Sequence, residues 1–121
     1  MPNNKKKCIF TLREAQALLP RVKELTEQAA VRVESIREEI ESCPPGERLA
    51  SLEGLTQQVV QTWAQAIEGL GCEAKGLWLV DFDSGDGIFY CWQHPETNLE
   101  FFHDYGTGFA GRKPLGPMLV N

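Results

Sequence analysis

A glycine-rich segment near the C-terminus has the spacing of a nucleotide-binding loop. Residues 103–116, HDYGTGFAGRKPLG, contain three glycines in the pattern G-x-G-x-x-G. A dinucleotide-binding loop needs a helix directly after its glycines, but two prolines follow here, and no Lys-Ser or Lys-Thr pair marks a P-loop. In one remaining interpretation, backbone N–H groups of Gly108 and Gly111 form an anion-binding nest beside Arg112. In the other, the glycines shape a structural tail and Phe109 enters the core.

Cysteine and histidine side chains in the second half of the chain could bind a metal ion. Cys91 and His94 have the spacing C-x2-H, and Glu96 and His103 follow. Zinc prefers four N, S or O ligands in a tetrahedron. The chain has only two histidines and no C-x-x-C pair, so we predict no cofactor and keep zinc at Cys91, His103 and Glu96 as the less favoured alternative. In the competing interpretation, Cys91 is a small core residue and His103 is a hydrogen-bonded residue of a sheet.

The same residues allow a thiol-dependent enzyme. Cys91 would be the nucleophile and His103 the base, with Asp81 or Asp104 as the acidic partner. No nucleophile signature surrounds Cys91, so the sequence favours a protein without enzymatic activity.

A ligand, if the chain binds one, is expected where the edge of a sheet meets the C-terminal tail. The candidates for this site are His103, Asp81, Arg112 and the backbone of Gly108 and Gly111. The guanidinium of Arg112 would bind an anion or an acidic side chain. Alternatively, Arg112 forms a salt bridge with Asp104 or Asp81 that fixes the tail.

A long helix is expected to begin near the N-terminus. Thr11 and Glu14 have the spacing of a capping box, which places the first helical residue at Leu12. Pro20 lacks an N–H group and crowds the preceding turn, which predicts a kink or a break there. Small and apolar residues recur at intervals of three and four, as in a coiled-coil seam, at Ala15, Leu19, Val22, Thr26, Ala29, Val33, Ile36 and Ile40.

A second helix is expected over residues 47–70, after the turn-forming sequence SCPPGE. Its seam comprises Leu49, Leu52, Thr56, Val59, Trp63, Ala66 and Leu70. The two helices would form an antiparallel hairpin over residues 12–71. Gly54 inside the second helix lowers helix stability by about 1 kcal/mol relative to alanine. Either the protein tolerates this loss, or Gly54 allows the two helices to approach each other closely.

The hydrophobic pattern changes near Lys75 from helical to alternating, and no strand is expected before that point. The runs LWLVDFD, IFYCWQ and LEFFHD are rich in aromatic and β-branched residues and are separated by turn-forming stretches. They predict a three-stranded antiparallel meander over residues 77–104 that packs on the hairpin. With a flexible N-terminus (1–9) and an ordered Gly-Arg tail (105–121), we expect one α+β domain over residues 1–121.

The composition allows a globular protein and disfavours several classes. The chain has 121 residues, 42% of them hydrophobic, and a net charge of −5. A negative charge disfavours a nucleic-acid-binding surface, and no apolar run reaches the roughly 20 residues of a membrane helix. We therefore expect neither nucleic acid nor membrane as a partner. With no secretory signal, we expect a cytoplasmic protein whose four cysteines are free thiols.

The helical seams suggest a protein partner. One small sheet cannot cover both sides of a two-helix hairpin, and an uncovered apolar stripe needs a partner. We therefore predict a non-enzymatic binding or protein-interaction module that self-associates through its helices as a homo-oligomer. An unknown protein partner is a further option. The alternative function is a metal-binding or thiol-dependent enzyme with a site around Cys91 and His103.

Four segments resemble, in order, the motifs of a known family: FTLREAQALLPRVKEL, GCEAKGLWLVDFDS, YCW and FFHDYGTGFAGRKPL. The chain thus resembles the uncharacterised bacterial proteins called domain of unknown function 2203. The resemblance covers nearly the whole chain and implies a cytoplasmic bacterial protein without an assigned activity. The family positions that it implies are Asp81, Cys91, Trp92, Glu96, His103, Gly108, Phe109, Gly111 and Arg112. A Gly-Glu turn would be expected of the family where this chain has His94-Pro95-Glu96, so His94 is not among them.

Overall fold

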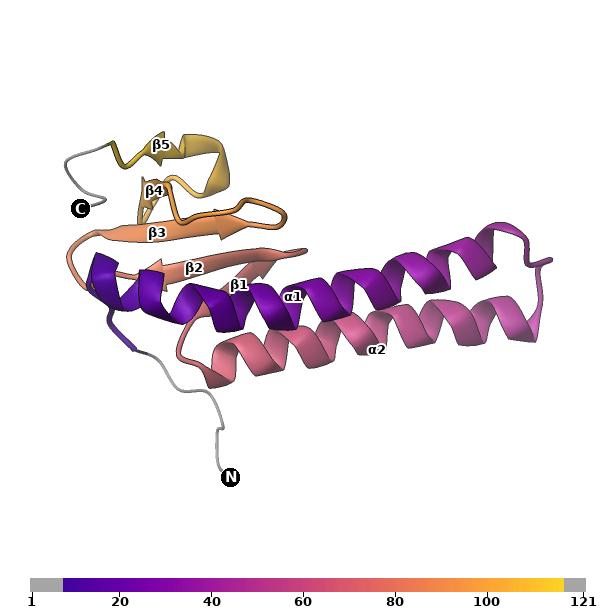
Figure 1. Ribbon diagram of the computed structural model, residues 1–121. Coiled ribbons are helices and arrows are strands. Elements are labelled where there is room, and N and C mark those ends of the chain that lie inside the picture. Colours follow the sequence, from indigo (N-terminus) through magenta and orange to yellow (C-terminus); the bar gives the residue numbers. More distant parts are fainter. Residues whose placement is uncertain (1–7, 117–121) are drawn as a thin grey trace, which may run out of the picture.

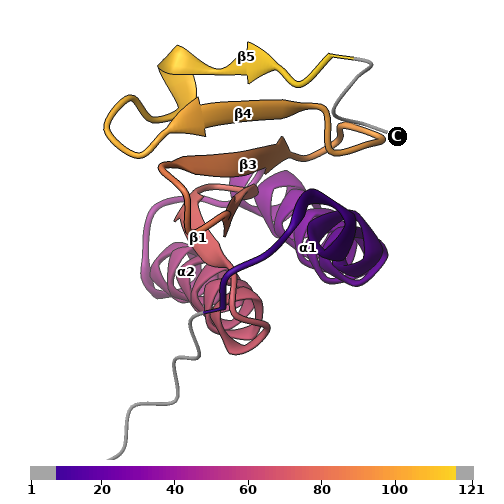
Figure 2. The same cartoon turned by 90° about the vertical axis from the view of Figure 1, so that its left-hand side faces the viewer.

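A helical hairpin packs on a five-stranded antiparallel sheet in the computed structural model, which describes residues 8–116 (Figures 1 and 2). The helices and strands are α1 (Leu12–Glu41), α2 (Glu47–Gly69), β1 (Glu73–Gly76), β2 (Leu79–Asp83), β3 (Ile88–Gln93), β4 (Phe101–Asp104) and β5 (Lys113–Pro114). A 3-10 turn, η1 (Phe109–Gly111), precedes β5. The strands lie in the order β1-β2-β3-β4-β5. The predicted α+β class is confirmed.

The first helix begins where the sequence predicts. Thr11 Oγ1 accepts from the Glu14 N–H at 3.1 Å, and Glu14 Oε1 accepts from the Thr11 N–H at 2.9 Å, which completes the capping box. Pro20 does not break the helix, because α1 is continuous from Leu12 to Glu41. Pro20 is exposed, so water can solvate the carbonyl that its missing N–H leaves without a helical partner. Of the predicted kink or break, the break is therefore wrong, and the kink stays a prediction.

The sheet has two edge strands that the sequence did not predict. The three expected strands correspond to β2, β3 and β4, but β1 pairs with β2 and β5 pairs with β4. β1 begins at Glu73, before the expected change of pattern at Lys75. Both additional strands are short, and β5 is exposed. Backbone pairing rather than side-chain alternation holds them in place, so their sequences carry little strand signal.

The helices cover one face of the sheet. Alternate residues of β2 and β3 point toward them, and the shared core comprises Val80, Phe82, Trp92, Ala15, Leu19, Val22, Trp63 and Ile67. Within it, the indole N–H of Trp63 donates to Thr26 Oγ1 at 2.8 Å, and the Thr26 hydroxyl donates to the Val22 carbonyl at 2.8 Å. This buried bond joins the two helices. β4 and β5 lie farther from the helices than β1, β2 and β3 (Figures 1 and 2).

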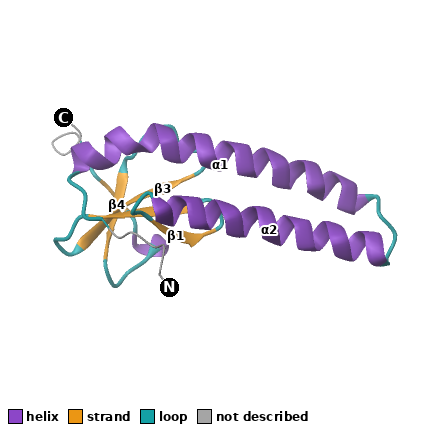
Figure 3. Ribbon diagram, turned by 90° about the horizontal axis from the view of Figure 1, so that it is seen from below, coloured by secondary structure: helices purple, strands orange, loops and turns teal. Residues whose placement is uncertain are grey.

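The hairpin extends well beyond the sheet (Figures 1 and 3). A Cβ added at Gly54 would meet nothing within 4 Å, so the predicted close helix–helix approach at Gly54 is wrong. Within the described residues, no helix is both long and apolar enough to cross a membrane.

Backbone hydrogen bonds hold the N-terminal end of the described chain in place. The Cys8 N–H donates to the Gly71 carbonyl at 3.2 Å, and the Phe10 N–H donates to the Asp83 carbonyl at 2.8 Å. Residues 1–7 of the expected flexible N-terminus and residues 117–121 of the expected tail lie outside the described residues. All four cysteines are free thiols, as expected.

Candidate functional site

Three side chains with metal-binding chemistry lie together on the sheet face that points away from the helices. Asp81 in β2 stands directly opposite Cys91 in β3, and His103 in β4 stands opposite Phe89 in β3. Because side chains alternate along a strand, Asp81 and Cys91 point away from the core neighbours Val80 and Trp92. Asp81, Cys91 and His103 form what we call the Asp81 cluster. Their ligand atoms all lie within 4.8 Å of one another.

The Asp81 cluster is buried although it lies outside the helix-facing core. The exposed fractions of Asp81, Cys91 and His103 are 1%, 0% and 3%. The ring of Phe89 lies 5.4 Å from the His103 ring, and the ammonium of Lys75 lies 4.7 Å from the centre of the Phe89 ring. Water therefore does not solvate these polar groups, and they must satisfy one another.

Both ring nitrogens of His103 face oxygen atoms. Nδ1 lies 2.9 Å from the Asp104 carbonyl, and Nε2 lies 3.0 Å from Asp81 Oδ2. A neutral imidazole carries one N–H and can donate only once. The arrangement therefore needs one more positive charge: a second proton on His103, a proton on Asp81, or a cation between Nε2 and the carboxylate.

The environment of the cluster raises the pKa of two of its members. Burial raises the pKa of Asp81 above its ordinary value, against the opposing effects of His103, Cys91 and Lys75. Burial also raises the pKa of Cys91 to about 12, and the Asp81 charge adds to this effect. Oδ1 of Asp81 is buried and has no hydrogen-bond partner of ordinary geometry. Without a metal, Cys91 is a neutral, inaccessible thiol, which argues against a thiol nucleophile.

Arg112 lies next to the cluster but pairs with Glu96. Its guanidinium donates to the two Glu96 oxygens at 2.7 and 2.8 Å and to the Cys91 carbonyl at 3.2 Å. The predicted salt bridge with Asp104 or Asp81 is therefore wrong. The turn after β3 brings Glu96 back beside its own strand, since Glu96 Oε1 also accepts from the Gln93 N–H at 2.9 Å.

Two aromatic rings stack on Arg112. The centres of the Phe101 and Phe109 rings lie 4.1 and 4.6 Å from the guanidinium carbon. Phe109 remains 44% exposed, so the interpretation in which it enters the core is wrong. These contacts fix η1 and β5 to the sheet.

Gly108 and Gly111 are required by the local backbone conformation of the tail. Gly108 has φ +68°, and a Cβ at Gly111 would come within 2.6 Å of the Thr107 Cβ. The N–H groups of Gly111 and Arg112 donate to the carbonyls of Gly108 and Phe109. The Gly111 N–H and both Nη groups of Arg112 therefore already have partners, whereas Arg112 Nε is buried without one; the anion-binding nest at Gly108 and Gly111 stays a prediction.

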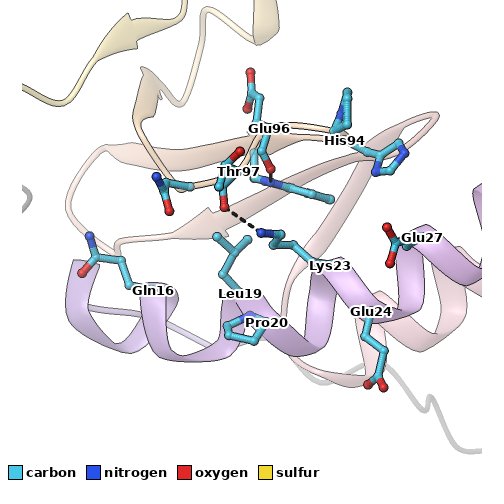
Figure 4. A pocket seen from close by; sticks show the side chains of 12 residues that line it. Gln16, Leu19, Pro20, Lys23, Glu24, Glu27, His94, Glu96 and Thr97 are labelled. Atoms are coloured by element: carbon cyan, nitrogen blue, oxygen red, sulfur yellow. Dashed lines mark hydrogen bonds between the residues drawn. The ribbon is translucent and has the colours of Figure 1, made fainter.

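His94 and Glu96 are not part of the Asp81 cluster, which is the one group of this kind in residues 8–116. Glu96 is paired with Arg112. His94 lines a cleft of about 620 Å³ between α1 and the 92–98 turn, where Lys23 Nζ donates to the Thr97 carbonyl at 2.8 Å (Figure 4). The structure thus brings His103 and Asp81 together with Cys91, and separates them from His94.

Sequence reasoning missed the residues that surround the site. Glu96 was proposed as a metal ligand rather than as the partner of Arg112. Phe89, whose ring lies beside His103, and Lys75, whose ammonium lies over the Phe89 ring, are not among the predicted residues. Strand alternation could have grouped Phe89 with Cys91 on one face, but no signal in the spacing links Glu96 to Arg112.

Comparison with known proteins identifies the family. The chain matches no curated protein and no solved structure. Residues 8–115 match the family model described as "Uncharacterized conserved protein (DUF2203)", and the chain therefore belongs to this family.

Proposed function

We propose that the protein binds a zinc-class divalent metal ion through Asp81, Cys91 and His103. One observation carries the proposal: Nε2 of His103 and Oδ2 of Asp81 face each other at 3.0 Å, beside a thiol, in a buried position. A metal ion between these atoms would supply the positive charge that a neutral imidazole lacks. Carboxylate, thiolate and imidazole are all ligands that zinc accepts.

The orientation of His103 supports this proposal. Metal-binding histidines commonly donate their second ring N–H to a carbonyl, which leaves the other nitrogen free for the metal. The contact from Nδ1 to the Asp104 carbonyl, at 2.9 Å, is of this kind. Nε2 is then the nitrogen without a proton, and it is the one that points toward Asp81 and Cys91.

The spacing of the ligand atoms also fits a metal site. With zinc–ligand bonds of about 2.0–2.3 Å, ligand atoms in a tetrahedron lie about 3.3–3.7 Å apart. The ligand atoms of the three side chains lie within 4.8 Å of one another. Metal binding would therefore change the distances between these atoms by about 1 Å or less. The Cys91 thiol must lose its proton when the metal binds, which the ion's charge makes possible.

The proposal can be tested with matched variants. The two histidines and the two buried cysteines allow paired comparisons: His103→Ala against His94→Ala, and Cys91→Ala against Cys72→Ala. We expect wild type, His94→Ala and Cys72→Ala to bind one Zn²⁺ per chain by elemental analysis. His103→Ala and Cys91→Ala should bind none.

Cobalt gives a second readout that does not depend on variants. Co²⁺ bound to wild-type protein should show a thiolate charge-transfer band, which is absent if Cys91 is not a ligand. Metal at 100-fold above its Kd should also stabilise the fold by about 2.7 kcal/mol. A wild-type protein that takes up neither ion would overturn the proposal, as would loss of metal from all four variants alike.

A further inference from the structure

The helical hairpin carries an apolar face that no part of the described chain covers. Between residues 30 and 60, Ile36 and Leu52 are the only buried residues. The other seam positions of this stretch are only half-buried: Val33, Ile40, Leu49, Thr56 and Val59. This half of the hairpin extends beyond the sheet (Figures 1 and 3), so each helix has one neighbour where a packed bundle would give it two or more.

A groove of about 540 Å³ runs between the two helices. We call it the hairpin groove. Its apolar lining is Leu25, Ala29, Leu55, Val59, Trp63 and Ala66. Its polar rim is Gln28, Arg32, Gln58 and Thr62. The rim residues are exposed, whereas the apolar residues apart from buried Trp63 are half-buried. An apolar strip with a polar rim is typical of a protein–protein contact.

We propose that the hairpin groove binds the hairpin groove of a second copy of this chain, so that two hairpins form a four-helix arrangement. In a two-fold contact each residue near the axis meets its own copy, so charged residues there would repel one another. The chain has 17 acidic residues and a net charge of −5, yet none of the residues that line the groove is acidic. Arg32 is the single charged residue in the lining.

Three of the four rim residues are uncharged, which suits a symmetric contact. Gln28, Gln58 and Thr62 each carry both a donor and an acceptor. Such side chains can hydrogen-bond to their own copies across a two-fold axis. A binding site for an oppositely charged partner would instead need a row of like charges, which this rim lacks.

The size of the face is sufficient for a stable dimer. The groove lining covers residues 55–66 of α2, and a contact along the whole of α2, which has 23 residues, would be about 35 Å long at about 1.5 Å per residue. Two helices side by side are about 20 Å wide, so the contact would bury about 700 Å² per copy, or about 1,400 Å² in total, within the range of specific interfaces.

The oligomeric state tests this proposal directly. Sedimentation velocity on a dilution series should show a wild-type dimer. Val59→Glu places a charge in the middle of the groove and should weaken the dimer at least 100-fold. Val31→Glu is the matched control, because Val31 is 66% exposed and does not line the groove; this variant should stay dimeric.

A second variant separates loss of association from loss of folding. Thr62 is exposed, so Thr62→Glu should leave the fold and its circular dichroism unchanged while it also weakens the dimer. A wild-type monomer at the highest concentration reached would overturn the proposal and leave the groove to a helix of a different protein. Dimers of undiminished affinity in both Val59→Glu and Thr62→Glu would overturn it as well.

Discussion

Separating Arg112 from Glu96 should detach the C-terminal tail from the sheet. The guanidinium makes two bonds to the carboxylate, at 2.7 and 2.8 Å, and the side chains are 12% and 24% exposed. It also donates to the Cys91 carbonyl and stacks on the rings of Phe101 and Phe109. Arg112→Ala removes all of these contacts at once and leaves Glu96 without a cation.

The contacts of Arg112 determine how much stability Arg112→Ala should lose. Hydrogen bonds to charged groups contribute about 1.5–3 kcal/mol each, and a partly desolvated cation–π contact contributes about 1 kcal/mol. These values do not add fully, because the groups share one side chain and remain partly wet. We expect Arg112→Ala to lower the free energy of unfolding by about 2–4 kcal/mol. The pairwise coupling with Glu96→Ala should be about 1.5–3 kcal/mol.

A second Arg–Glu pair provides the control. Arg48 and Glu39 lie 2.9 Å apart with side chains 71% and 51% exposed. Their coupling should not exceed about 0.5 kcal/mol. Urea unfolding of wild type and of the two double-mutant cycles measures both values. Equal coupling in the two pairs would refute the claim that burial and bidentate geometry make Arg112 the stronger anchor.

Three further outcomes are expected from the packing. Thr26→Val should lower the free energy of unfolding by about 1–3 kcal/mol in thermal or urea unfolding, because it leaves the buried N–H of Trp63 without an acceptor; an unchanged stability would contradict the buried bond. Gly54→Ala should raise stability by about 1 kcal/mol, since the added Cβ meets nothing within 4 Å; a loss would indicate an unrecognised contact. In thiol titration of the metal-free protein, Cys43 should react before Cys91, because burial raises the pKa of Cys91 to about 12; simultaneous reaction would contradict its burial.

The helices could be predicted because their signals are local. The capping box of Thr11 and Glu14 lies within one turn, and the seam periodicity is visible in any window of the two helices. Pro20 shows the limit of such signals. Whether a proline breaks a helix depends on what surrounds its turn. Here Pro20 itself is exposed, while Leu19 and Val22 on either side of it are buried in the core.

The site was predicted only in part because strand register decides which side chains meet. His103, Asp81 and Cys91 were all candidates, but the sequence placed Arg112 with Asp81 and His103 in one ligand site. The strand register sets Cys91 opposite Asp81. Arg112 contacts the backbone carbonyl of Cys91 instead of the side chains of the cluster. A shift of one residue would have moved Cys91 to the helix-facing side, and no feature of the sequence fixes that register beyond the pattern of the core.

The two proposed binding regions should act independently. The Asp81 cluster lies on the sheet face away from the helices, whereas the hairpin groove is lined by helix residues alone. Zinc binding could change the affinity of the dimer only through a part of the fold that has two conformations, each favoured differently by zinc and by the second copy. Dimerisation would then change the zinc affinity by the same factor. The contact between the sheet and the helices is a close-packed core around Trp92 and Trp63, which resists small displacements. Zinc should therefore leave the dimer dissociation constant unchanged in sedimentation. A zinc-dependent constant would mean that the core transmits a shift from β2 and β3 to the hairpin.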